Sequence, residues 1–157
     1  MKNLRAFLAA LTIASLACIT VANAQSLPSP SALTLKGGVS VPSNADVQNS
    51  GIALGADYIF HPSSVLEPFN LSVYGDLLAK SGGVGVAIRN GGPVYIGAGA
   101  GFYSTSVTAG TSSGFGGKIF GGFDIAPHTT LELGYHMLPK LNGTDTNVVS
   151  AQVGFRL

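Results

Sequence analysis

The chain has 157 residues, a length that one domain can accommodate. Charged residues make up only 10% of it, glycine occurs 22 times and the mean hydropathy is +0.40. This composition is too apolar for a disordered chain and too rich in glycine for a helical one.

Residues 1–24 have the pattern of a secretory signal peptide. Lys2 and Arg5 precede an apolar run over 6–21, and Ala22-Asn23-Ala24 offers small residues where a signal peptidase cuts, so we expect cleavage before Gln25. A transmembrane anchor is the alternative, but the run is short and polar residues interrupt it. Removing two of the eight basic residues leaves six against seven acidic ones, so no basic patch remains for nucleic acid.

The single cysteine, Cys18, lies inside this segment, so the mature chain is expected to contain neither a thiol nor a disulfide. Lipoprotein processing at Cys18 is a second alternative. The leucine before it, Leu16, lies one position away from where such processing sites usually carry it.

Residues 25–32, with Pro28 and Pro30 among serines, are expected to form a short flexible lead-in to a barrel domain at 33–157. Turn residues then separate segments of alternating polarity, which predict strands. The eight predicted strands are Leu33–Val41, Gly51–Phe60, Phe69–Leu78, Val84–Arg89, Val94–Ser104, Gly114–Ile125, Thr130–Leu138 and Val148–Leu157.

The alternation assigns two faces to these strands, because side chains in a strand point to opposite sides in turn. One face is apolar and carries no charge; it includes Leu35, Leu54, Val86 and Ile119. The opposite face holds four basic and four acidic residues, a histidine and many glycines. The ionisable residues of this inner face are Lys36, Asp57, Asp76, Arg89, Lys118, Asp124, Glu132, His136 and Arg156.

Two kinds of eight-stranded barrel, and a β-sandwich, could carry such strands. A soluble barrel of the lipocalin type buries its apolar face inside and shows charges to water, and a sandwich would also point charges to water. The glycines on the charged face favour a narrow interior instead, where a long side chain needs space opposite. Aromatic residues near strand ends, such as Tyr58, Phe155, Phe102 and Phe115, are typical of the girdles of membrane barrels.

An even number of strands returns both termini to one side, which predicts two sets of turns. The periplasmic turns would be His61–Pro68, Asn90–Pro93 and Ala126–Thr129. The outer loops would be Pro42–Ser50, Ala79–Gly83, Thr105–Ser113 and Pro139–Asn147, which are polar but not long.

The chain ends on a strand whose apolar face consists of Val149, Ala151, Val153, Phe155 and Leu157. Such a strand resembles the C-terminal assembly signal of bacterial outer-membrane barrels, which the barrel-assembly machinery recognises, although the last residue there is usually aromatic. The run Gly117–Tyr135, with its Ala-Pro-His turn at 126–128, resembles the penultimate hairpin of the outer membrane protein A and X families. The resemblance implies an eight-stranded antiparallel up-and-down transmembrane β-barrel in the bacterial outer membrane.

The charged inner face predicts a structural ion-pair network that closes the lumen. Charges are costly to remove from water unless they are paired, and the numbers of positive and negative groups match. A polar path for a solute is the alternative, but eight strands enclose a space only wide enough for their own side chains.

No catalytic, cofactor or metal site is predicted. His136 shares a face with Glu132 but has no serine two positions away, so a network role is favoured over catalysis. His61 and His128 lie in turns, and Gly97–Gly101 lacks the Lys-Ser/Thr ending of a phosphate loop.

These patterns predict a non-enzymatic, monomeric outer-membrane protein in contact with outer-membrane lipid. It would contribute to envelope integrity or present a small binding surface on its loops. The alternative is a lipid-modifying enzyme, or a carrier that passes small apolar solutes through a lateral opening. Weak pairing of the short strand Val84–Arg89 would favour the alternative.

Overall fold

The computed structural model describes residues 32–44, 49–60, 69–107 and 110–157. The expected signal peptide, its cleavage site and Cys18 lie outside these residues. So do the lead-in up to residue 31 and the turn His61–Pro68. Within the described residues no helix is long and apolar enough to span a membrane.

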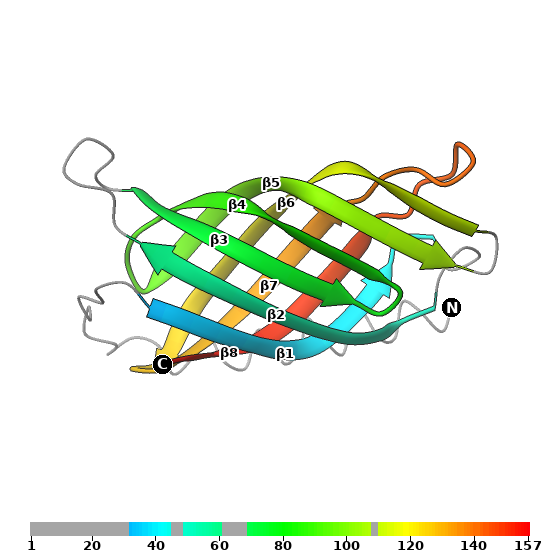
Figure 1. Ribbon diagram of the computed structural model, residues 1–157. Helices are drawn as coiled ribbons and strands as arrows, with labels where there is room; N and C mark the ends of the chain where they lie inside the picture. Colours follow the sequence, from blue (N-terminus) through cyan, green and yellow to red (C-terminus); the bar gives the residue numbers. More distant parts are fainter. Residues whose placement is uncertain (1–31, 45–48, 61–68, 108–109) are drawn as a thin grey trace.

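The described chain is a closed antiparallel barrel in which each strand pairs with the next and β8 pairs back with β1 (Figure 1). This confirms the predicted fold class and strand order. The strands are β1 (Ala32–Pro42), β2 (Gly51–Phe60), β3 (Phe69–Leu78), β4 (Ser81–Asn90), β5 (Val94–Val107), β6 (Gly110–Ala126), β7 (Thr129–Met137) and β8 (Val148–Arg156).

The closing seam between β1 and β8 runs without interruption from Thr34 opposite Arg156 to Pro42 opposite Val148. Every strand therefore has two hydrogen-bonded neighbours. A barrel without edges satisfies its backbone internally, which is what a β-protein needs in order to cross lipid.

β4 is longer than predicted: it begins at Ser81 rather than Val84 and has ten residues. It pairs with β3 from Leu78 opposite Ser81 to Phe69 opposite Asn90, and with β5 along nearly its whole length. Gly82 and Gly83 read as turn residues in the sequence, but they lie inside the strand, and only Ala79 and Lys80 form the turn. The expected outer loop at Ala79–Gly83 is thus a two-residue connection, and β4 is not weakly paired.

The segment Thr105–Ser113 was also expected to be an outer loop, and most of it is strand. β5 and β6 extend as a hairpin as far as Val107 opposite Gly110. The polar residues that suggested a loop pair across the hairpin: Ser113 donates a hydrogen bond to Ser104 over 2.9 Å, and the hydroxyls of Ser106 and Thr111 are 3.2 Å apart. Such cross-strand hydroxyl pairs stabilise strands as apolar pairs do.

The outer surface of the barrel is apolar around its circumference. Side chains that would be buried in a soluble protein are half or more exposed here, such as Ile52 (70%), Ile96 (66%) and Ile119 (50%). The charged side chains of the strands point inward, where most are buried. Because this polarity is the reverse of a soluble barrel's, the solvent that fits the outer surface is lipid.

Candidate functional site

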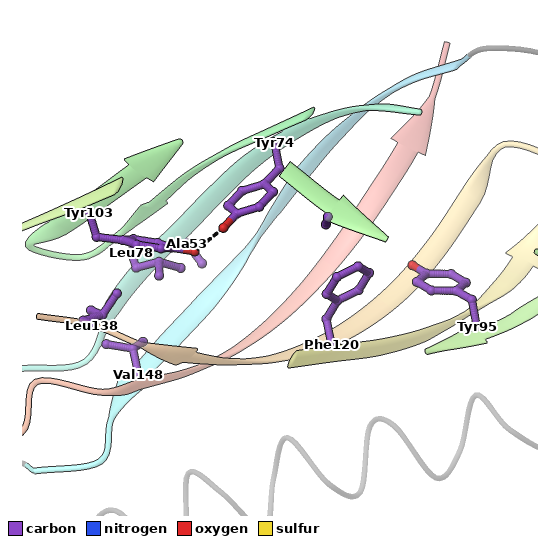
Figure 2. Close-up of a cluster of buried hydrophobic side chains, with 9 residues drawn as sticks. Ala53, Tyr74, Leu78, Tyr95, Tyr103, Phe120, Leu138 and Val148 are labelled. Carbon is purple, nitrogen blue, oxygen red and sulfur yellow. Dashed lines mark hydrogen bonds between the residues drawn. The ribbon is translucent and has the colours of Figure 1, made fainter. Parts of the chain in front are cut away.

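Two tyrosines fill the outer half of the lumen, because glycines on neighbouring strands leave space for their rings. A Cβ atom on Gly83 would overlap the ring of Tyr103, and one on Gly85 would lie 2.6 Å from the hydroxyl oxygen of Tyr74. A third glycine, Gly116, faces the other side of the Tyr103 ring at 2.8 Å. The two tyrosine hydroxyls are 2.8 Å apart and share a hydrogen bond (Figure 2). The inner-face glycines thus have the steric role expected of them.

The middle of the lumen holds a cluster of two lysines and three carboxylates. Nζ of Lys36 lies 2.7 Å from Asp57 and 2.7 Å from Glu132. Nζ of Lys118 lies 3.1 Å from Asp76 and 3.9 Å from Asp57. All five side chains are buried. The cluster therefore ties together β1, β2, β3, β6 and β7, and we refer to these five residues as the central cluster.

Aromatic side chains contact Lys118 and Glu132 of this cluster. Nζ of Lys118 lies 3.8 Å from the centre of the Tyr74 ring and 5.0 Å from that of Phe120, both distances at which a cation is attracted to the ring face. The hydroxyl of Tyr95 donates a hydrogen bond to Glu132 over 3.1 Å. Phe120 was not among the predicted lumen residues, although strict alternation puts it on the same face as Lys118.

His136 lies beside the central cluster and contacts Asp76 and Ser150 rather than Glu132. Its Nε2 is 3.0 Å from the Ser150 hydroxyl, and its Nδ1 is 3.8 Å from a carboxylate oxygen of Asp76. The space for this contact comes from Gly134, whose Cβ would lie 2.9 Å from the Ser150 oxygen. The contact with Ser150 could not be predicted from β7 alone, because Ser150 lies on the neighbouring strand β8.

The order Asp76, His136, Ser150 resembles that of a serine hydrolase triad, but its position does not allow that chemistry. His136, Ser150 and Asp76 each expose only 2% of their surface. A nucleophile needs room for the substrate carbonyl and for groups that stabilise the oxyanion. These three residues are enclosed among side chains of the lumen, and the arrangement gives the buried imidazole one hydrogen-bond partner, Ser150 at Nε2, while Nδ1 makes no hydrogen bond.

The end of the lumen where the C-terminus lies (Figure 1), which is expected to face the periplasm, holds two arginines and one acid. Nη2 of Arg156 lies 3.2 Å from Asp124. Arg89 makes no ion pair with any carboxylate of the described residues; its guanidinium lies 4.2 Å from the centre of the Tyr95 ring. The matched numbers of opposite charges therefore do not form one-to-one pairs, since Glu132 and Asp57 share Lys36 and Arg89 is left with an aromatic partner.

Apolar side chains close the outer end of the lumen. Alternation along the strand places Tyr103 on the inner face, whereas Leu78, Leu138 and Val148 were not expected there. Leu78, Tyr103 and Val148 are fully buried, and Leu138 lies beside Val148 (Figure 2). Leu141 adds to this outer cap from the loop between β7 and β8, where it is 7% exposed.

A tight turn holds that loop in place. Asn142 and Gly143 have φ angles of 50° and 80°, and the backbone of Leu141 pairs with that of Thr144 in both directions. Positive φ at both central residues is the pattern for which Asn-Gly is favoured. The loop is anchored to β6, because the Ser112 hydroxyl donates to the Lys140 carbonyl oxygen over 2.9 Å.

The C-terminal strand β8 presents its predicted apolar face to the outside. Val153, Phe155 and Leu157 are about half exposed or more, while Val149 and Ala151 are partly covered. The strand is fully paired with β7 and β1. Recognition of this strand by an assembly machinery stays a prediction. Among the described residues no group of His, Cys, Asp and Glu side chains is arranged to hold a metal ion.

Comparisons with known proteins found no matching family model and no matching curated protein. Solved structures do match. The crystal structure of Neisserial surface protein A superposes with a TM-score of 0.59 over 82% of this chain and 97% of that one, at 17% sequence identity. The attachment invasion locus protein Ail of Yersinia pestis matches with a TM-score of 0.37 over 82% of this chain and 100% of that one, at 14% identity.

At 17% sequence identity, the match to Neisserial surface protein A is a likeness of fold alone. Together with the closed antiparallel sheet and its apolar outer surface, it establishes that this chain has the fold of the small eight-stranded outer-membrane β-barrels.

Proposed function

We propose that the protein is a non-enzymatic outer-membrane barrel with a closed lumen, which supports envelope integrity or presents a small binding surface to the outside. The observation that carries this proposal is the double closure of the lumen. The central cluster joins five strands through ion pairs of 2.7 to 3.9 Å, and the outer cap lies above it. In a barrel filled in this way, the side chains of the lumen stabilise the fold and leave no path for a solute.

The outward surface would be offered by the β5–β6 hairpin, which combines the two longest strands, of 14 and 17 residues. Its exposed outer end carries Ser104, Ser106, Thr111 and Ser113 and no charge. A hydroxyl-lined hairpin of this kind supports a small binding surface better than a broad adhesive one. Lipid of the outer membrane, and the barrel-assembly machinery during insertion, are the partners that the apolar surface and β8 favour, and the barrel would act as a monomer.

The alternative of a lipid-modifying enzyme or a solute carrier depends on an opening in the wall or a reactive group at the surface. The β4 pairing with both neighbours argues against the opening. The burial of Ser150 and His136 argues against the enzyme.

The closed lumen is tested in a planar lipid bilayer with the purified protein. We expect no stable ion-conducting openings; steady openings would contradict the proposal. The membrane location is tested separately by cell fractionation and by gel mobility. The protein should fractionate with the outer membrane and migrate faster unheated than boiled, because folded barrels stay compact in detergent. Recovery as a soluble periplasmic protein would reject the membrane assignment.

A further inference from the structure

The charges inside the lumen are unevenly distributed along its axis. The central cluster contains two lysines and three carboxylates, so it has an excess of negative charge. At the end of the lumen where the C-terminus lies, Arg156 pairs with Asp124, and Arg89 lies over the Tyr95 ring and pairs with no carboxylate of the described residues. We refer to Arg89, Arg156 and Thr34 as the mouth donors.

Arg89 is the cation whose surroundings are incomplete. Its guanidinium carbon lies over the ring of Tyr95, and its Nε is buried without a hydrogen-bond partner. The Tyr95 ring cannot accept the in-plane N–H groups of a guanidinium that lies over its face. Arg89 is only partly buried, but its shielded Nε–H still lacks an acceptor, which an anion would supply.

The other mouth donors are incomplete in the same way. Arg156 contacts Asp124 through Nη2, while its Nε is buried with no partner. Thr34 lies directly across from Arg156 on β1, is 4% exposed, and its hydroxyl also has no partner. All three groups can donate hydrogen bonds, and the planar fork of arginine matches the oxygens of a carboxylate or a phosphate.

The position of these groups decides from which side a ligand would enter. Arg89 and Asp124 are only partly buried, whereas the side chains of the central cluster are almost completely enclosed. The outer cap closes the opposite end. A ligand would therefore reach Arg89 from the periplasm and stop below the central cluster.

We propose that the periplasmic mouth of the lumen binds a small oxyanion, a carboxylate or a phosphate group, between Arg89 and the Arg156–Thr34 pair. This site is independent of whether the barrel conducts ions, and it adds a periplasmic ligand to a protein whose proposed surface activity lies outside.

The full chain contains only three arginines, Arg5, Arg89 and Arg156, so its arginine Nε–H NMR spectrum is simple to assign. The protein is refolded in dodecyl maltoside, a detergent without phosphate or carboxylate, and titrated with sodium phosphate or sodium acetate against sodium chloride at equal ionic strength. We expect the Arg89 and Arg156 resonances to shift and to saturate with either oxyanion. Shifts of the same size with chloride, or shifts that do not saturate, would overturn the proposal.

Variants identify the residues responsible. Arg89→Lys removes one resonance and keeps the positive charge, but it loses the planar guanidinium with its paired N–H donors. The shift of the Arg156 resonance during the oxyanion titration should therefore no longer saturate. Lys140→Gln, at an exposed ion pair with Asp145 on the outer loop, is the matched control and should leave both titrations unchanged. A saturating Arg156 shift that survives in Arg89→Lys would contradict the assignment to Arg89.

Two further arms separate the sources of the anion. Phosphatidylglycerol added to the micelles replaces the free ions: a response to the lipid alone assigns the site to a lipid headgroup, and a response to the free ions assigns it to a soluble ligand.

In the second experiment Glu67, which lies outside the described residues, is replaced by glutamine. If phosphate binds only to Glu67→Gln, then the chain supplies its own carboxylate and the proposed ligand site does not exist.

Discussion

Nζ of Lys36 and Oε1 of Glu132 lie 2.7 Å apart inside the lumen, although 96 positions separate the two residues and strand β8 lies between theirs. The lysine reaches across β8 at Gly154, its direct neighbour in the sheet, where a Cβ would lie 3.2 Å from Cγ of Lys36. The contact joins the first strand to the seventh, so it can form only when the barrel has closed.

Replacing Lys36 with methionine should therefore destabilise the closed barrel strongly. The change keeps much of the side-chain volume but leaves Asp57 and Glu132 buried without their shared cation. Breaking a buried ion pair in this way costs about 3–5 kcal/mol. Urea unfolding in lipid vesicles measures the effect.

The matched control is Lys140→Met. Lys140 and Asp145 form an ion pair of similar length, 3.2 Å, but their side chains are 66% and 60% exposed. Exposed pairs contribute about 0–1 kcal/mol, so this variant should unfold at nearly the parental urea concentration. Equal effects of the two substitutions would show that the central cluster adds nothing to stability.

The glycines that leave space for the tyrosine rings are expected to be intolerant of larger side chains. Gly83→Ala would place a methyl group in the Tyr103 ring, and overpacking of this kind costs about 1–3 kcal/mol. Gly37→Ala is the control, because Gly37 faces outward and its nearest atom is a Leu54 methyl at 3.9 Å. Heat-modified gel mobility across a temperature series should show earlier unfolding for the first variant alone. Adding Tyr103→Leu to Gly83→Ala should relieve the clash; if it does not, the ring is not its cause.

The contact between His136 and Ser150 is predicted to be structural. Ser150→Ala removes the hydrogen-bond partner of a buried imidazole nitrogen, which costs about 1–3 kcal/mol. A fluorophosphonate probe should not label the folded parent protein at Ser150, because the hydroxyl is enclosed. Labelling that disappears in Ser150→Ala would instead indicate a reactive serine and revive the enzymatic alternative.

Much of the fold could be predicted from the sequence, because a side-chain period of two is a local property that membrane burial enforces on every strand. Lys118 and Ile119 are adjacent in the chain, yet Lys118 is 2% exposed and Ile119 is 50% exposed. This difference follows directly from the side-chain period of two. The errors came where local composition suggested a turn. Gly83 needs no side chain because Tyr103 occupies that space, and this relation between two strands is not visible in either strand alone.

The partners of the inner charges could not be predicted, because they depend on reach across the lumen. Matching counts of cations and anions did not reveal that Lys36 would serve two carboxylates or that Arg89 would lie on Tyr95. Leu141 of the outer cap was not predicted for a related reason: it comes from a loop, where alternation gives no orientation.

The last prediction concerns the direction in which β6 faces. Ile119 lies on the apolar outer surface near the middle of the strand, next to the inward Lys118. A lysine on the lipid side near the membrane centre costs about 2–4 kcal/mol, which is a large share of a typical net stability of about 5–15 kcal/mol. Ile119→Lys should therefore lower the yield of folded barrel sharply when the protein is refolded into lipid vesicles.

The control for this variant is Ser106→Lys, on the same outward face of the hairpin that β6 forms with β5, but near its exposed outer end. A lysine there should reach water, so the yield should match that of the parent protein. The two variants add the same charge to the outward face of the hairpin, one near its middle and one near its outer end. If Ile119→Lys refolds as well as Ser106→Lys, then the surface around Ile119 does not face hydrocarbon, and the transmembrane position of this part of the barrel is wrong.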